Sequence, residues 1–250
     1  MLKVLRAVAC AALALLALPA AAGENAPVPI GVVELFTSQG CNSCPPADAA
    51  LQKLAQRSDV VALSWHVDYW DYLGWKDTLA SPANTKRQYG YARTLKRSNV
   101  YTPQAVLNGI DHINGGDLDG IVTRLHQFAV DGKGLNVPLQ FTDKGDRLHL
   151  TIPATDRPDD ATVLLVYFAP RQETQIERGE NAGKTIAYVN SVLDFMPVGM
   201  WKGEELTIDL PVSGMTDRGA GGCAVLLQRQ AADGTPGEII GAAILVDLSG

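Results

Sequence analysis

The spacing of apolar residues changes once along the chain, at residues 131–134, and this change limits the folds that the chain can adopt. Before it, short apolar runs alternate with runs at helical spacing, which favours a mixed α/β layer around a central sheet. After it, short and often alternating apolar runs are separated by Gly, Pro, Asp and Asn, which favours a β-sandwich. We expect an α/β domain over residues 28–131 and a β-rich, sandwich-like domain over residues 135–250.

The same pattern predicts the individual elements. Three helices are expected, one beginning at Cys41 with Pro45 and Pro46 in its first turn, and two over residues 82–96 and 118–130. Strands are expected over residues 30–36, 60–67 and 104–107 in the first half, and over residues 135–141, 147–152, 162–168, 187–195, 205–210, 223–229 and 239–246 in the second.

The first 22 residues are typical of a secretory signal peptide. Lys3 and Arg6 precede the apolar run Ala7–Leu18, and Ala20, Ala21 and Ala22 offer a small-residue cleavage site. The run is too short to cross a hydrocarbon core of about 30 Å, and no later segment is long and apolar enough to do so. We therefore expect a periplasmic or secreted protein without a membrane span after signal cleavage.

The charge of the chain argues against two classes of partner. The formal net charge is −6, and no run of Lys and Arg is present. Binding to nucleic acid or to an anionic membrane depends on clustered cations, so neither partner is expected. No glycine motif for nucleotides is present either, and we expect no organic cofactor.

The spacing of the cysteines points to chemistry rather than to a structural crosslink. Signal cleavage removes Cys10 and leaves Cys41, Cys44 and Cys223. A three-residue separation restrains the unfolded chain little, so the Cys41-x-x-Cys44 pair indicates a reactive couple or a metal site. A helix start stabilises a thiolate, which predicts that Cys41 is the nucleophile and the more exposed sulfur. Cys44 is expected to lie deeper and to resolve the mixed disulfide. Cys223 is expected to be a buried apolar residue, the alternative being a third redox thiol.

Other residues fit the same chemistry. Glu34 interrupts an apolar strand, and it is either a buried proton acceptor for Cys44 or an exposed or salt-bridged acid. The aromatic segment 65–75 predicts a groove wall or a packed core end, and its groove candidates are Trp65, His66, Asp68 and Trp70, together with Thr102. In the second half, Arg178, Glu180, Asn181 and Lys184 form either a salt-bridged turn or an interface with the first half.

Four phrases of the chain resemble a known family. ELFTSQGCNSCPPAD (34–48), WHVDYWDYLGWKD (65–77), VYTPQAVLNG (100–109) and IERGENAGKTIAYVN (176–190) resemble the exported bacterial family called domain of unknown function 1223, and the order of elements resembles the thioredoxin superfamily. The resemblance implies an α/β thioredoxin-like domain followed by a β-rich, sandwich-like C-terminal domain. It further implies that Cys41 is the nucleophile, Cys44 the resolving cysteine, Pro103 a cis-proline facing the pair, and Glu34 an approximate match to the buried acid.

Three hypotheses for the function follow. The first is a thiol–disulfide oxidoreductase that acts on a protein or small-molecule thiol or disulfide. The second is a copper or zinc carrier with Cys41, Cys44 and His66 as ligands. The third is a non-catalytic binding module that uses the aromatic segment. The substrate, the direction of electron flow and the oligomeric state do not follow from the sequence.

Overall fold

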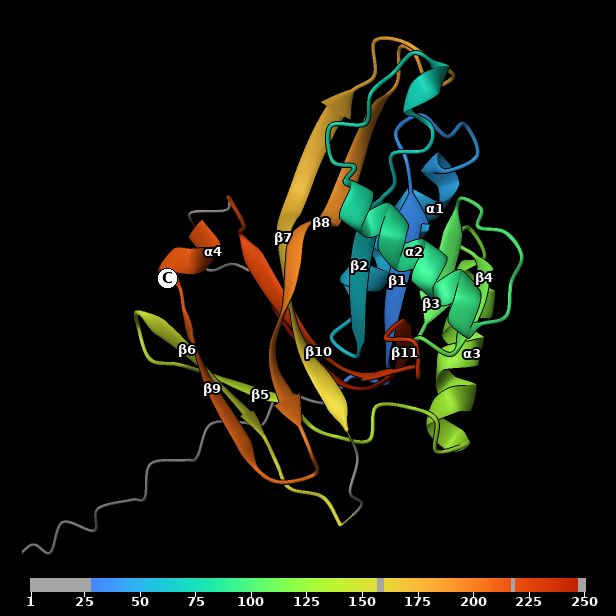
Figure 1. Ribbon diagram of the computed structural model, residues 1–250. Coiled ribbons are helices and arrows are strands. Elements are labelled where there is room, and N and C mark those ends of the chain that lie inside the picture. The colour runs from blue at the N-terminus through green and yellow to red at the C-terminus, as the bar shows by residue number, and fades with distance from the viewer. Residues whose placement is uncertain (1–27, 157–159, 217–218, 247–250) are drawn as a thin grey trace, which may run out of the picture.

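One large sheet runs through both halves of the chain (Figure 1). The structure is a computed structural model that describes residues 28–156, 160–216 and 219–246, so the predicted signal peptide lies outside the described residues. The order of the eight strands is β11-β10-β7-β8-β2-β1-β3-β4. Their bounds are β1 Gly31–Thr37, β2 Val60–His66, β3 Gln104–Leu107, β4 Asp111–Asn114, β7 Ala161–Gln175, β8 Thr185–Trp201, β10 Gly222–Gln230 and β11 Pro236–Val246.

Helices cover both faces of the first half of this sheet. Helices α1 (Pro45–Ala55) and α3 (Leu118–Val130) pack on one face with Val33 and Leu35 of β1. Helix α2 (Pro82–Thr94) packs on the other face, toward which Val32 and Phe36 point. The alternation of side chains along β1 therefore separates two apolar cores, one under α1 and one under α2.

The helices begin where the sequence supplies capping groups. Ser81 accepts a hydrogen bond from the Asn84 N–H, and Asp117 accepts one from the Gly120 N–H. The expected helix at Cys41 begins later, at Pro45, because the two prolines supply no N–H groups and take the first turn. A single 3-10 turn, η1 (Asp71–Leu73), lies in the aromatic segment.

The second half contributes a sandwich-like layer. A three-stranded sheet of β5 (Gln140–Asp143), β6 (Arg147–Ile152) and β9 (Leu206–Pro211) shares an apolar core with β7, β10 and β11. The short helix α4 (Ser213–Thr216) follows β9.

One of the two sheets of the second half continues into the first half, so the sandwich-like layer shares its larger sheet with the α/β part. Strand β8 pairs in parallel with β2, where Ser191 lies beside Ser64, and Asn190 Nδ2 donates to the Ala62 carbonyl at 2.8 Å. This pairing occupies the edge of β2, which would otherwise present unpaired backbone groups. Whether residues 28–131 and 135–250 act as separate domains stays a prediction.

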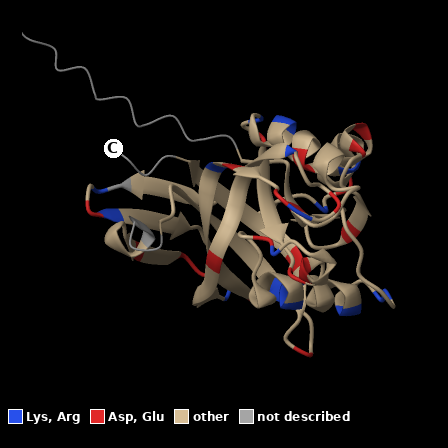
Figure 2. Cartoon of the chain, turned by 90° about the horizontal axis from the view of Figure 1, so that it is seen from above, with Lys and Arg blue, Asp and Glu red and all other residues tan. Residues whose placement is uncertain are grey.

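The charged residues lie mostly on helices and loops, while the strands carry few of them (Figure 2). This agrees with a sheet that is covered on both faces in the first half. In the described part of the chain, no helix has the length and apolar character needed to cross a membrane.

A tight contact joins the β3–β4 turn to the β10–β11 hairpin. The Ile239 N–H donates to the Asn108 carbonyl at 2.8 Å. Gly109 follows with a φ of +69°, and a Cβ atom there would lie 2.1 Å from the Gly237 carbonyl oxygen. No side chain can be placed at this position without moving one of the two turns.

We expect Gly109→Ala to destabilise the protein by at least about 2 kcal/mol more than Gly132→Ala in urea unfolding. Gly132 has the same φ of +69° but no atom within 4 Å of a built Cβ, so it measures the backbone strain alone, about 1 kcal/mol. Equal losses in the two variants would contradict the close approach of the two turns.

Candidate functional site

The two cysteines of the Cys-x-x-Cys sequence form a disulfide directly before α1. Strand β1 ends at Thr37, a turn follows in which the Cys41 N–H donates to the Ser38 carbonyl, and the Cα atoms of Cys41 and Cys44 lie 5.4 Å apart. Cys44 occupies the cap position of α1, and its carbonyl accepts from the Ala47 and Asp48 N–H groups. The helix start therefore fixes the position of Cys44.

Cys41 is more covered than the sequence suggested. Its exposed fraction is 1% and that of Cys44 is 0%, so the expected difference in exposure between the two cysteines is almost absent in this oxidised state. A residue from the second half of the chain bonds to this segment. Asn181 Nδ2 donates to the carbonyls of Gln39 at 2.9 Å and Cys41 at 2.8 Å, which holds a distant loop against the cysteines. Between the cysteines, Asn42 and Ser43 stay exposed.

The loop that supplies Asn181 connects β7 to β8 and lies near the end of β1 (Figure 1). Lys184 Nζ donates to Asn181 Oδ1 at 2.8 Å and so orients its amide. Gly179, with a φ of +79°, packs beside Trp75. Of the two interpretations of this polar segment, the geometry supports an interface with the first half.

A carboxyl group lies one helical turn below Cys44. Asp48 is buried, and its Oδ1 accepts a hydrogen bond from the Thr37 hydroxyl at 2.8 Å. Burial raises the pKa of Asp48 to about 7, against a smaller lowering by His66 and Thr37. Residues four apart share a helix face, so Asp48 lies on the side of α1 that carries Cys44.

His66 and Asp77 form a second part of the same buried region. His66 Nδ1 lies 2.8 Å from Asp77 Oδ2, which also accepts from the Gln39 N–H at 2.8 Å. Burial works against a charged imidazole, yet the Asp77 carboxylate raises the pKa of His66 above its ordinary value. The ring of Tyr188 meets that of His66 edge-on, with 4.7 Å between their centroids.

Three polar atoms of this region have no hydrogen-bond partner among the described residues: Asp48 Oδ2, His66 Nε2 and the Tyr188 hydroxyl. We call Asp48, His66, Asp77 and Tyr188 the buried polar cluster. Buried polar groups without partners are rare, and each usually has a functional reason or an internal water. The cluster therefore marks the region below the disulfide as chemically unusual.

Comparison with known proteins places the chain in a family. The sequence profile described as "Protein of unknown function (DUF1223)" matches residues 32–228. The chain belongs to the DUF1223 family. No curated protein matches this DUF1223 sequence.

Two solved structures are similar to this DUF1223 protein. The crystal structure of a protein from Agrobacterium tumefaciens, a structural-genomics target, shares 50% identity with a TM-score of 0.81 and covers 90% of this chain and 97% of its own. HBP35 of Porphyromonas gingivalis shares 14% identity with a TM-score of 0.62, covering 89% of this chain and 76% of its own, which is a likeness of fold alone.

Glu34 does not lie with the cysteines of the DUF1223 protein. It points to the α2 face of the sheet, where Arg87 Nε donates to it at 2.6 Å and the Tyr91 hydroxyl also donates. The salt-bridged interpretation of Glu34 is the one that the structure supports. The buried acid on the helix that follows Cys44 is instead Asp48, whose position four residues after Cys44 was the available signal in the sequence.

The groove candidates separate into two groups. Trp65 lies fully inside the core under α2, so its assignment to a groove is wrong, and the Arg87 guanidinium lies 4.7 Å from its ring centroid. His66 is likewise buried, in the polar cluster. Trp70 is half-buried and lies against Gly40, and its Nε1 donates to the Thr102 hydroxyl at 2.8 Å. Asp68, also half-buried, accepts from the Thr85 hydroxyl.

The remaining predicted residues are placed as follows. The Thr102–Pro103 peptide bond is cis, as the resemblance implied. Cys223 is a free cysteine in the core between the two sheets, and burial raises its pKa to about 12. Within the described ranges, no three His, Cys, Asp or Glu side chains are arranged to hold a metal ion, so the structure does not gather Cys41, Cys44 and His66 into one ligand set.

Replacing Asn181 by Ala is expected to speed reduction of the Cys41–Cys44 disulfide by dithiothreitol several-fold, because the loop loses both bonds that hold it against the cysteines. Thiol trapping measures the rate. Asn136→Ala is the control, since Asn136 is exposed and its Nδ2 donates to the Gly132 carbonyl, outside the β7–β8 hairpin and the cysteine loop. An unchanged rate in Asn181→Ala would show that the loop does not limit access.

Asp48→Asn is expected to flatten the pH dependence of stability. The pKa of Asp48 is about 7 in the folded chain and 3.8 ordinarily, so as the pH rises the unfolded chain loses this proton at a lower pH than the folded chain does. The free energy of unfolding therefore falls as the pH rises from about 4 to 7. The variant lacks this loss, which amounts to up to about 4 kcal/mol. Urea unfolding at pH 5 and 8 measures it, with the exposed Asp119→Asn as control. Parallel profiles for wild type and Asp48→Asn would refute the assignment.

Proposed function

We propose that this protein is an exported thiol–disulfide oxidoreductase that uses the Cys41–Cys44 couple. The observation that carries the proposal is the disulfide at the start of α1 with a buried carboxyl of raised pKa one turn below it. A helix start favours a thiolate, and a base with a pKa near neutrality suits proton transfer from a thiol.

The arrangement of the first half supports a thioredoxin-like assignment for residues 28–131. Strands β2-β1-β3-β4 are adjacent in this order, with β1 parallel to β2 and antiparallel to β3. The cysteines precede α1, and the cis bond to Pro103 precedes β3. Trp70 and Thr102 then form a candidate wall for substrate beside the cysteine loop.

In the reducing direction, the Cys41 thiolate attacks a substrate disulfide, whose S–S bond breaks and releases one substrate thiolate. Cys44 loses its proton to the Asp48 carboxylate and attacks the Cys41 sulfur of the mixed disulfide. The second substrate thiolate leaves as the Cys41–Cys44 bond forms, so two electrons have passed from the dithiol to the substrate. The reverse sequence oxidises a substrate dithiol.

The buried polar cluster supports the step at Cys44. His66, held by Asp77, lies near enough to Asp48 to lower its pKa, which keeps part of the carboxyl ionised and able to accept a proton near neutral pH. The predicted signal peptide is consistent with an oxidising compartment, where disulfide exchange occurs.

The first test is a redox titration of the mature protein in glutathione buffers, after chelation, with thiol trapping read by mass. A reversible two-electron couple at Cys41 and Cys44 is the expected outcome, and its potential distinguishes an oxidant from a reductant. A pair that stays a disulfide at every attainable potential would end the proposal.

A pair of variants tests the two cysteine roles. Cys44→Ser leaves Cys41 without its resolving partner, and it is expected to accumulate a mixed disulfide with oxidised glutathione. Cys41→Ser is expected to form at least tenfold less. Cys223→Ser, which removes the buried free thiol, is the control and behaves as wild type. Equal adduct formation in the first two variants would contradict the assignment of Cys41 as nucleophile.

A further inference from the structure

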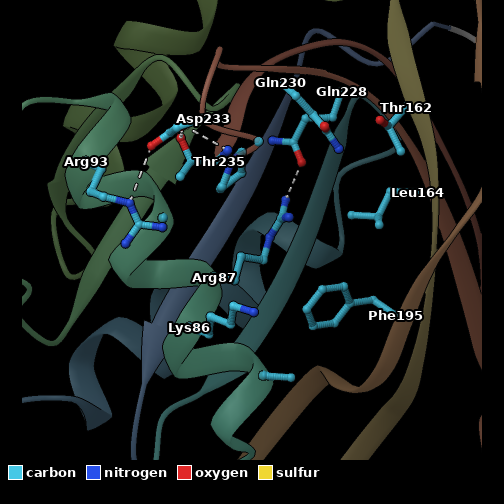
Figure 3. A pocket seen from close by; sticks show the side chains of 14 residues that line it. Lys86, Arg87, Arg93, Thr162, Leu164, Phe195, Gln228, Gln230, Asp233 and Thr235 are labelled. Carbon is cyan, nitrogen blue, oxygen red and sulfur yellow. Dashed lines mark hydrogen bonds and ion pairs between the residues drawn. The ribbon is translucent and has the colours of Figure 1, made fainter.

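A cavity of about 530 Å³ lies between α2 and the strands of the second half (Figure 3). Its volume is in the range of small-molecule sites. One side of α2 forms one wall, while β7, β8, β10 and the β10–β11 turn form the others. The cysteines lie before α1, which packs on the opposite face of the sheet, so this cavity is separate from the disulfide.

The inner wall of the cavity carries a buried guanidinium group. The side chain of Arg87 is 5% exposed. Its Nε donates to Glu34, and its Nη2 donates to the Tyr91 hydroxyl and to Gln228 Oε1, each at 3.0 Å. The other terminal nitrogen, Nη1, makes no hydrogen bond with any residue that the structure describes, and it keeps two donor hydrogens for a ligand.

Two further donors accompany Arg87. Lys86 is exposed at the mouth and has no ion-pair partner within the described ranges, and the Gln230 amide likewise has no hydrogen-bond partner there. Figure 3 shows Lys86 and Arg87 on one wall and Gln230 across from them. An anion bound here would accept charge-assisted hydrogen bonds from Arg87 and Lys86, which are stronger than bonds between neutral groups.

The balance of charge at the cavity is positive. Arg93 is paired with Asp233 at 3.7 Å, and Arg87 is paired with Glu34, which leaves Lys86 as one unpaired cation. This excess lies on a chain whose formal charge is −6. A ligand with one negative charge matches this one unpaired cation.

Apolar surface lies beside the donors. Leu164 and the half-buried Phe195 line the same cavity, and the Phe195 ring is fixed edge-on against Trp65 with 5.1 Å between centroids. The Arg87 guanidinium carbon lies 5.8 Å from the Phe195 ring centroid, so the charged head and the apolar body of one small ligand reach both at once.

We propose that this cavity binds a small organic anion, an alkyl or aryl carboxylate or sulfonate, with its head at Arg87 Nη1, Lys86 and Gln230 and its apolar body over Leu164 and Phe195. The site is independent of the cysteine chemistry. It is expected to bind equally well in the Cys41→Ser variant.

The test measures the binding of the probe 8-anilinonaphthalene-1-sulfonate to the folded mature protein by fluorescence and by calorimetry. A saturable isotherm with one site is expected. Octanoate is expected to displace the probe at least tenfold more effectively than 1-octanol, which has the same chain without the charge. Displacement by both to the same extent would show an apolar surface only and overturn the anion assignment.

Variants locate the site. Ala83→Trp places a large ring in the cavity from an exposed position of α2 and is expected to weaken binding at least tenfold, while Tyr89→Trp, on an exposed residue of the same helix outside the lining, leaves it unchanged. Lys86→Gln is expected to weaken binding three- to tenfold, with the exposed Lys53→Gln of α1 as its control. Probe binding that is insensitive to both Ala83→Trp and Lys86→Gln would refute the proposal.

Discussion

The parallel pairing of β2 with β8 is the interaction on which the arrangement of the two halves depends. It joins strands that are more than a hundred residues apart, and the Asn190 amide reinforces it from within β8. Because β8 is one arm of a long hairpin with β7, fixing β8 also fixes the loop that ends the hairpin. That loop brings Asn181 to the cysteines. The second half therefore supplies part of the site as well as the remainder of the sheet.

Two buried polar groups use opposite faces of the same central strands. On the α2 face, Glu34 is neutralised by Arg87 and Tyr91, so its charge is fully compensated. On the α1 face, Asp48 has one hydroxyl partner, and its other oxygen has no partner among the residues that the structure describes. The first arrangement holds α2 against the sheet, and the second leaves a carboxyl free to exchange a proton. Both acids are buried, so it is the number of hydrogen-bond partners that distinguishes Glu34, which is fully bonded, from Asp48, which is not.

Local patterns were sufficient for elements whose residues also pack locally. Strands β1 to β3, the three main helices and the cap at Ser81 follow from apolar spacing and turn residues. The sequence does not predict residues 169–175 of β7 or 196–201 of β8. Residues 171–175 are polar and alternate between exposed and half-buried, and Pro197 and Gly199 interrupt the later run. Asp48 was overlooked because an acid in the first turn of a helix is ordinarily an exposed residue that the helix dipole favours. Glu34 was noticed, but its partner is 53 residues away and no spacing indicates it.

The contact between Asn181 and Cys41 spans 140 residues, whereas the disulfide itself spans three. During synthesis from the N-terminus, the cysteines emerge long before the loop that contacts them. The Cys41–Cys44 pair is thus open at first, and only the completed chain brings the loop against it. The cysteines are therefore freely accessible while the chain is being made, and access to them is restricted once the chain has folded.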